Sequence, residues 1–179
     1  LVAGVAERRS VKASTMRPSQ VACEFLRTYE NSLPLDKQSH TARREMAQDA
    51  LSFFRMYPGL FYKDIRDGVL SVDIGQGPAP KTLIQGDCHI GNFGTVRGAK
   101  STLWAANDFD CAQESRPEID LVRLVSSIIV AKPTLSEEEV TKAVVDGYRE
   151  SCQEIAQDGP KACAGVHHHQ SSGAVKKLI

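Results

Sequence analysis

The spacing of apolar residues in the first third of the chain follows a helical period. Apolar positions three or four residues apart predict helices over residues 19–31, 39–55 and 60–66. Pro34 separates the first two helices, and Pro58-Gly59 separates the last two. The chain is therefore expected to begin with a group of helices.

The pattern changes to short stretches typical of β-strands after these helices. Residues 69–74 alternate apolar and polar side chains, as a half-buried strand does. Residues 82–84 predict a short buried strand that leads directly into Gly86-Asp87. Two further short strands are predicted over residues 93–96 and 103–106.

Two more helices are predicted after the strands. From Arg116-Pro117 onward, apolar residues occupy nearly every side of a helix, a pattern typical of a buried helix, and Pro133 ends it. The next helix has Ser136 as its N-cap, acidic residues in its first turn, and an end near Ala156. The order of helices, strands and helices predicts an α+β fold with a small β patch.

The remaining residues complete the predicted domain organisation. We expect one domain over residues 1–179, with residues 161–179 as a flexible tail. The His167–His169 run in this tail lacks further ligands at a suitable spacing for a metal site. Because the chain starts without Met, we expect it to be a piece of a longer protein.

Composition and charge exclude several classes of protein. The chain has 22 Lys plus Arg and 22 Asp plus Glu residues, so its net charge of zero gives no reason to expect nucleic acid or an anionic membrane as a partner. No apolar run reaches the roughly 18 residues of a membrane span, and no signal peptide is evident. Five irregularly spaced cysteines favour free thiols and a cytoplasmic location.

Polar residues suited to phosphoryl transfer follow the ends of two predicted strands. QGDCHIGNFG contains Asp87 and, five residues later, Asn92, while the later stretch ANDFD contains Asp108. Phosphoryl transfer requires a carboxylate that orients the attacking hydroxyl and oxygen ligands that hold Mg²⁺ against the nucleotide phosphates. These residues therefore predict Asp87 as the catalytic base and Asn92 and Asp108 as magnesium ligands.

Other residues near the loop are predicted to support the site. Asp120 lies at the start of the buried helix, where its carboxylate can accept backbone N–H bonds and hold the loop rigid. Arg55 or Lys63 can supply a cation for a phosphate group, although a structural salt bridge is an equally open reading of Arg55. Cys88 is expected to be a small buried residue and not a reactive thiol.

The motifs GDCHIGN, NDFD and PEIDLVRL resemble those of aminoglycoside phosphotransferases, choline kinases and their relatives. The resemblance implies the fold of a kinase catalytic lobe, with ATP and Mg²⁺ as cofactors. It also implies one role for each matching residue: Asp87 as base, Asn92 and Asp108 as magnesium ligands, Asp120 as a support for the loop, His89 as a packing and hydrogen-bonding residue, and Asp110 as a second-shell or second-metal ligand.

The chain also resembles a bacterial family, the domain of unknown function numbered 2252. The similarity lies in four segments, which are Phe53–Arg55, Gly86–Gly94, Asn107–Asp110 and Asp120–Leu124. It covers roughly residues 45 to 155, and the combination of motifs is more specific than GDxH alone.

One feature departs from the kinase pattern and leaves several functions open. Nothing before Gly86 resembles a Gly-rich phosphate loop or a strand with an ATP-binding lysine. A nucleotide lobe is therefore expected downstream or on a second chain. The leading hypothesis is transfer of the ATP γ-phosphate to a hydroxyl of an unknown small-molecule acceptor. The alternatives are a non-catalytic pseudokinase or regulatory domain and, from the Asp87-x-His89 motif, a metal-dependent phosphoesterase.

Overall fold

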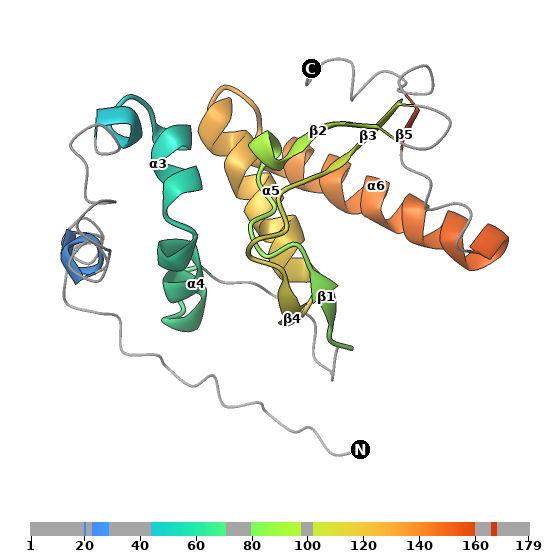
Figure 1. Ribbon diagram of the computed structural model, residues 1–179, viewed down its shortest axis with the longest axis horizontal. Coiled ribbons are helices and arrows are strands. Elements are labelled where there is room, and N and C mark those ends of the chain that lie inside the picture. The colour runs from blue at the N-terminus through green and yellow to red at the C-terminus, as the bar shows by residue number, and fades with distance from the viewer. Residues whose placement is uncertain are drawn as a thin grey trace, which may run out of the picture.

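The computed structural model describes residue 20 and residues 23–28, 44–70, 80–97, 102–159 and 166–167. Within these residues the fold is α+β, as predicted, with helices before and after the short antiparallel strands along the chain (Figure 1). Residues 23–28 are helical, in agreement with the first predicted helix. None of the described helices combines the length and the apolar character needed to cross a bilayer.

The second predicted helix, over residues 39–55, is wrong as a single element. Residues 44–46 are helical, but the helix does not continue, and α3 (Ala50–Met56) begins anew after Asp49. The backbone N–H of Ser52 donates to Asp49 Oδ1 over 2.8 Å, so Asp49 caps α3. An Asp side chain that binds the backbone at an N-cap favours a new helix start over a continuous helix, which the apolar spacing could not show.

Helix α4 (Pro58–Arg66) starts earlier than predicted. Pro58 is its first residue, because a proline has no N–H to lose in the first turn and its backbone angle suits a helix. Gly68, two residues after the end of α4, has a positive φ of 71°. The strand predicted over residues 69–74 is not formed at Val69 and Leu70, and its other residues lie outside the described part of the chain.

The strands form two small antiparallel sheets. The three other predicted strands are confirmed as β1 (Thr82–Ile84), β2 (Phe93–Arg97) and β3 (Thr102–Ala106). Strand β2 pairs with β3, and β5 (Val166–His167), from the expected tail, pairs with the other edge of β3.

Strand β4 (Gln113–Ser115) pairs with β1 and was not predicted, because its short polar sequence carries no strand signal. Its pairing also changes the expected environment of β1. Only Ile84 of β1 is buried, whereas Leu83 is 72% exposed, so the prediction of a buried strand is wrong for its first two residues.

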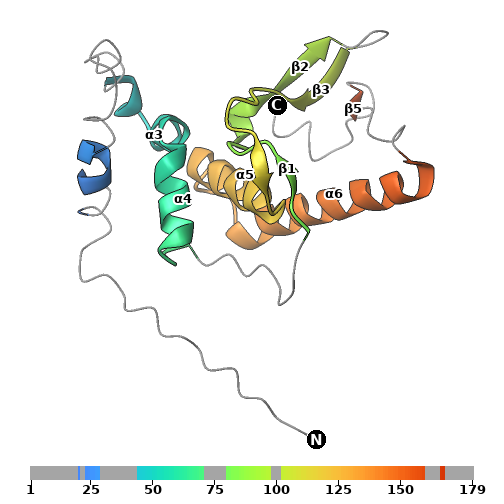
Figure 2. The same cartoon turned by 60° about the horizontal axis from the view of Figure 1, so that its bottom comes forward.

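The two predicted C-terminal helices are confirmed. They are α5 (Glu118–Ala131) and α6 (Glu137–Asp158), and the backbone N–H of Glu139 donates to the Ser136 hydroxyl at the start of α6. Helix α5 lies between α3 and α6, and the 3₁₀ turn η2 (Ile90–Asn92) contacts it (Figures 1 and 2). Helix α5 therefore forms the centre on which the loop after β1 rests.

The core includes aromatic residues of α3, of α4 and of the position between them, and also polar residues of α5. Phe61 and Tyr57 are 4% and 7% exposed, and the Phe54 ring packs edge-on against Phe61. On α5, however, the two fully buried side chains are Arg123 and Ser127, although the helix is rich in apolar residues. Buried polar groups of this kind need partners, and the loop after β1 supplies one for each of them, Asp87 and Ile90.

Candidate active site

The loop after β1 begins at Gly86, where only glycine fits. Its φ is +85°, and a Cβ atom at this position would lie 2.0 Å from the backbone oxygen of Cys111. The Tyr62 hydroxyl donates to the Gly86 carbonyl over 2.5 Å. Glycine thus allows the loop to pass tightly against the segment that follows Asp108.

Asp120 holds the start of this loop from the first turn of α5. The backbone N–H of Gln85 donates to its Oδ2 over 2.7 Å, and that of Gly86 donates to its Oδ1 over 3.0 Å. Burial raises the pKa of the Asp120 carboxyl, and the two backbone N–H groups act in the opposite direction. Asp120 therefore joins the loop to the central helix through the backbone, at the place where the sequence suggested such a contact.

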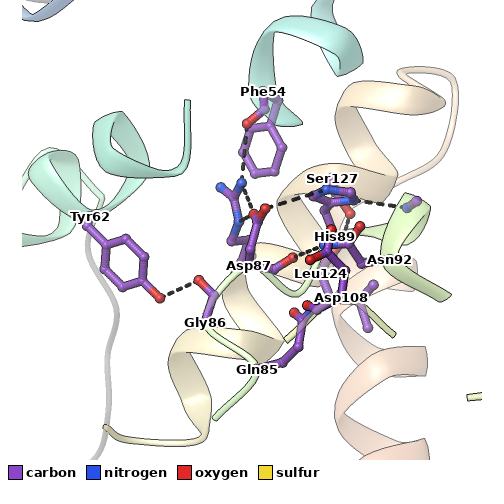
Figure 3. Close-up of polar contacts among 12 residues, drawn as sticks. Phe54, Tyr62, Gln85, Gly86, Asp87, His89, Asn92, Asp108, Leu124 and Ser127 are labelled. Atoms are coloured by element: carbon purple, nitrogen blue, oxygen red, sulfur yellow. Dashed lines mark hydrogen bonds and ion pairs between the residues drawn. The ribbon is translucent and has the colours of Figure 1, made fainter. Parts of the chain in front are cut away.

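Asp87 lies at the turn of the loop and forms an ion pair with a buried cation. Arg123 Nε donates to Asp87 Oδ1 over 2.5 Å, and Arg123 Nη2 contacts the same oxygen (Figure 3). The Asp87 side chain is 15% exposed, whereas that of Arg123 is 0% exposed. The carboxylate is therefore held from the protein side and still reaches solvent.

His89 is a buried residue whose two ring nitrogens have different surroundings. The backbone N–H of Gly91 donates to its Nδ1 over 3.1 Å, and its Nε2 lies 3.7 Å from Asp87 Oδ2. Because Nδ1 accepts a hydrogen bond, the proton of the neutral ring belongs on Nε2, which faces Asp87. Burial lowers the pKa of His89, while the Asp87 carboxylate acts to raise it.

The lowered pKa of His89 predicts a dependence of stability on pH. A histidine whose pKa is lower in the folded than in the unfolded chain favours folding above the unfolded value of about 6.5, and this contribution is lost as the pH falls. The urea midpoint of the wild-type chain should therefore fall more between pH 7.5 and pH 5.5 than that of His89→Gln. Equal losses in the two proteins would contradict the prediction.

Asn92 connects the loop to the segment that contains Asp108. Its side-chain Nδ2 donates to the Asp87 carbonyl over 3.0 Å, and its own carbonyl accepts the backbone N–H of Asn107 over 2.9 Å. Since the amide nitrogen is used in this way, Oδ1 is the side-chain atom of Asn92 that can bind a cation. The loop and the residues after β3 are thus joined directly.

Asp108 is held in an unusual backbone conformation. Its φ is +59°, which asparagine and aspartate tolerate better than most residues other than glycine. The buried Gln85 side chain donates through Nε2 to the carbonyls of Asn107 and Asp108, over 2.9 and 2.8 Å. This contact fixes the backbone on which the Asp108 carboxylate is mounted, while the residue itself is exposed.

The available donors fit Mg²⁺ better than a softer metal. Among the described residues, no three or more His, Cys, Asp and Glu side chains gather closely enough to hold an ion. Mg²⁺ needs only one or two carboxylates, because it keeps waters and binds substrate phosphates. The Asn92 amide oxygen and the exposed carboxylates of Asp108 and Asp110 supply donors of this type.

The cysteines near the site are suited to remain thiols. Burial raises the pKa of Cys88 to about 12, so its predicted character as a small buried residue agrees with the structure. Burial, followed by the charges of Asp87 and Asp108, also raises the pKa of Cys111. Both carboxylates thus lie within electrostatic reach of the same thiol. Cys23, Cys88, Cys111 and Cys152 are free.

Of the two cations considered for phosphate binding, Arg55 lies at the loop. A Cβ atom on Gly91 would lie 3.2 Å from both Cζ and Nε of Arg55, so the guanidinium packs directly over this glycine. Arg55 is exposed, and within the described residues no carboxylate lies at ion-pair distance from it. Lys63 instead pairs with Asp67 on α4.

Sequence reasoning did not identify Arg123, Ser127 and Gln85 as part of the site. Ser127 accepts the backbone N–H of Ile90 over 2.9 Å and donates to the carbonyl of Leu124, so it fixes η2 on α5. For Arg123 and Ser127 the available signal was the presence of polar side chains in an otherwise apolar helix, because such residues are buried only where they have partners.

Comparison with known proteins identifies one family. Residues 35–178 match a family described as "Uncharacterized protein conserved in bacteria (DUF2252)". The motifs had suggested a similarity over roughly residues 45 to 155, and the family match extends beyond this range at both ends. No curated protein and no solved structure matches the chain.

Proposed function

The chain belongs to this uncharacterised bacterial family, and we propose that it carries the catalytic and metal-binding part of a kinase-like phosphotransferase. Such an enzyme would transfer the γ-phosphate of ATP to a hydroxyl of a small-molecule acceptor. The observation that supports the proposal most directly is the joining of Asp87, Asn92 and the Asp108 segment by hydrogen bonds. Residues from two separate strand ends thereby contribute to one site.

Asp87 is the proposed base. A general base must lie within hydrogen-bond reach of the proton it accepts, and a carboxylate that is fixed yet partly exposed meets this condition. Arg123 occupies Oδ1, so Oδ2 is the oxygen proposed to orient and deprotonate the acceptor hydroxyl. His89, on the inner side of Oδ2, supports the carboxylate and does not react.

Asn92 and Asp108 are the proposed magnesium ligands, with Asp110 as a second-shell or second-metal ligand. When bound, the ion would neutralise charge on the nucleotide phosphates. Asn92 is 5% exposed and held by its own amide, whereas Asp108 is exposed on a fixed backbone. A rigid amide oxygen and an accessible carboxylate suit an ion that also binds the phosphates of a nucleotide arriving from solution.

Arg55 is the proposed contact for a phosphate group. Its guanidinium lies over Gly91, and fork-like guanidinium groups suit phosphate oxygens. The rest of the nucleotide site is expected from a lobe downstream or on a second chain. The resemblance in motifs to aminoglycoside phosphotransferases supports a small-molecule acceptor.

Calorimetry with ATP tests the nucleotide and metal parts of the proposal. The wild-type chain should bind ATP in the presence of Mg²⁺, and Asp108→Ala should weaken this binding by about tenfold or more, because it loses a charged ligand to the ion. Asp146→Ala, which changes an exposed carboxylate on α6, serves as the matched control and should bind like the wild type.

The outcomes separate the functional alternatives. Binding that depends on Mg²⁺ and on Asp108 supports a kinase-like site. Equal binding by Asp108→Ala would contradict the assignment of Asp108. No binding by the wild-type chain would favour a regulatory domain, or a site completed by another segment.

A further inference from the structure

Arg123 is a fully buried cation on α5, the central helix. Its side chain is 0% exposed, and its guanidinium carbon lies 4.4 Å from the centre of the Phe54 ring and 5.0 Å from that of Phe61. Removing a charged group from water costs several kcal/mol unless it is paired and hydrogen-bonded. Contacts between the guanidinium and the two aromatic rings offset part of this cost. The polar contacts of Arg123 must offset the rest.

The contact between Arg123 and Asp87 is asymmetric. Both Nε and Nη2 reach the same carboxylate oxygen, Oδ1, whereas Oδ2 lies 3.7 Å from His89. A fork that gripped both oxygens would engage Oδ2 as well as Oδ1. The observed arrangement fixes the plane of the carboxylate and leaves Oδ2 outside the ion pair.

Arg123 also connects helix α3 to the loop. Its Nη2 donates to the Phe54 carbonyl over 3.3 Å (Figure 3). The next residue along α3 is Arg55, whose guanidinium packs over Gly91. One buried side chain therefore contacts both the carboxylate proposed as base and the backbone that carries the proposed phosphate contact.

From these contacts we propose that Arg123 is a positioning residue, which turns Asp87 so that Oδ2 faces the acceptor and holds α3, with Arg55, against the loop. The proposal rests on the proposed function of Asp87 and adds the residue that orients it. Because Arg123 lies beneath Asp87 and is buried, it acts through Asp87 and does not touch the substrate.

A double-mutant cycle followed by urea denaturation tests the pairing without any activity assay. Asp87→Asn should lower the urea midpoint in the wild-type background, where it leaves the buried Arg123 charge unpaired. In the Arg123→Met background the same change should lower the midpoint much less. The surface pair Asp146–Arg149, with its oxygen and nitrogen 3.0 Å apart, provides the control and should behave additively. Equal losses from Asp87→Asn in both backgrounds would overturn the proposal.

Arg123→Lys tests orientation separately from charge. Lysine keeps the positive charge but cannot place two N–H groups on Oδ1 and a contact on the Phe54 carbonyl in one plane. The crystal structure of the folded variant should show the Asp87 carboxylate rotated away from its wild-type orientation. An unchanged carboxylate would overturn the proposal, whether or not the protein has enzymatic activity.

The same variant separates this proposal from the proposed function. If the wild-type chain transfers phosphate, Arg123→Lys should lower kcat by about tenfold or more, because Asp87 is misoriented, and KM for ATP should rise by a smaller factor, because Arg55 is held less firmly. An unchanged kcat would overturn the positioning role. Absence of turnover in the wild type would count against the proposed function alone, since the cycle and the crystal structure still decide the role of Arg123.

Discussion

Asp87→Asn is expected to abolish phosphoryl transfer and also to destabilise the fold. Loss of a general base lowers turnover by about 10²–10⁴-fold. The same substitution leaves the Arg123 charge, which is 0% exposed, without its anionic partner. Breaking a buried ion pair on one side costs about 3 kcal/mol or more, and we expect the lower value because the Asp87 side chain is 15% exposed.

This double effect differs from what the motif alone suggests. A catalytic carboxylate at a loop end would be expected to tolerate replacement by the isosteric amide with little loss of stability. Because Arg123 approaches the carboxylate from the buried side, Asp87 has both a proposed chemical role and a structural one. Loss of activity in this variant is therefore informative only if the protein is shown to be folded.

The measurement combines urea denaturation with turnover at a temperature where circular dichroism shows a native fold. Asp67→Asn is the matched control, since it removes the partner of Lys63 at the surface and should change the urea midpoint little. Full turnover by folded Asp87→Asn would refute the assignment of the base. Stability equal to the wild type would show that the Arg123 ion pair contributes little to folding.

Asp120→Ala is expected to lower the free energy of unfolding by about 3 kcal/mol. The carboxylate accepts two backbone N–H groups, from Gln85 and Gly86, and hydrogen bonds to a charged acceptor contribute about 1.5–3 kcal/mol each. Part of this gain is offset by burial of the carboxylate, which raises the pKa of Asp120. Without Asp120, the backbone at the start of the loop loses its attachment to α5.

Glu138→Ala provides the control for this effect. Asp120 and Glu138 both lie in the first turn of a helix, but Glu138 is exposed on α6, whereas Asp120 accepts two backbone N–H groups of the loop. Both variants lose a favourable charge at a helix N-terminus, whereas only Asp120→Ala loses the loop contacts. Similar urea midpoints for the two variants would show that the contacts with Gln85 and Gly86 contribute little.

Local patterns in the sequence determined much of the secondary structure. Helix α6 was predicted from its Ser136 cap and its apolar period, because both signals act between residues close in the chain. Strands β2 and β3 were also predicted from short stretches of neighbouring residues. The motifs around Gly86 and Asp108 also identified the family, which the match over residues 35–178 confirms.

Only the tertiary structure decided which residues meet. Strand β4 forms because β1 offers it an edge, and its own polar sequence carries no strand signal. The ion pair between Asp87 and Arg123 joins residues 36 positions apart, and Gln85 reaches the Asp108 carbonyl from 23 positions away.

Such contacts depend on how α5 packs against α3 and the loop, and no local period encodes that packing. The sequence by itself thus determined most of the described elements and suggested the candidate chemistry. The packing decided that a buried arginine pairs with Asp87, because the free energy of a buried charge depends on partners that come from distant parts of the chain.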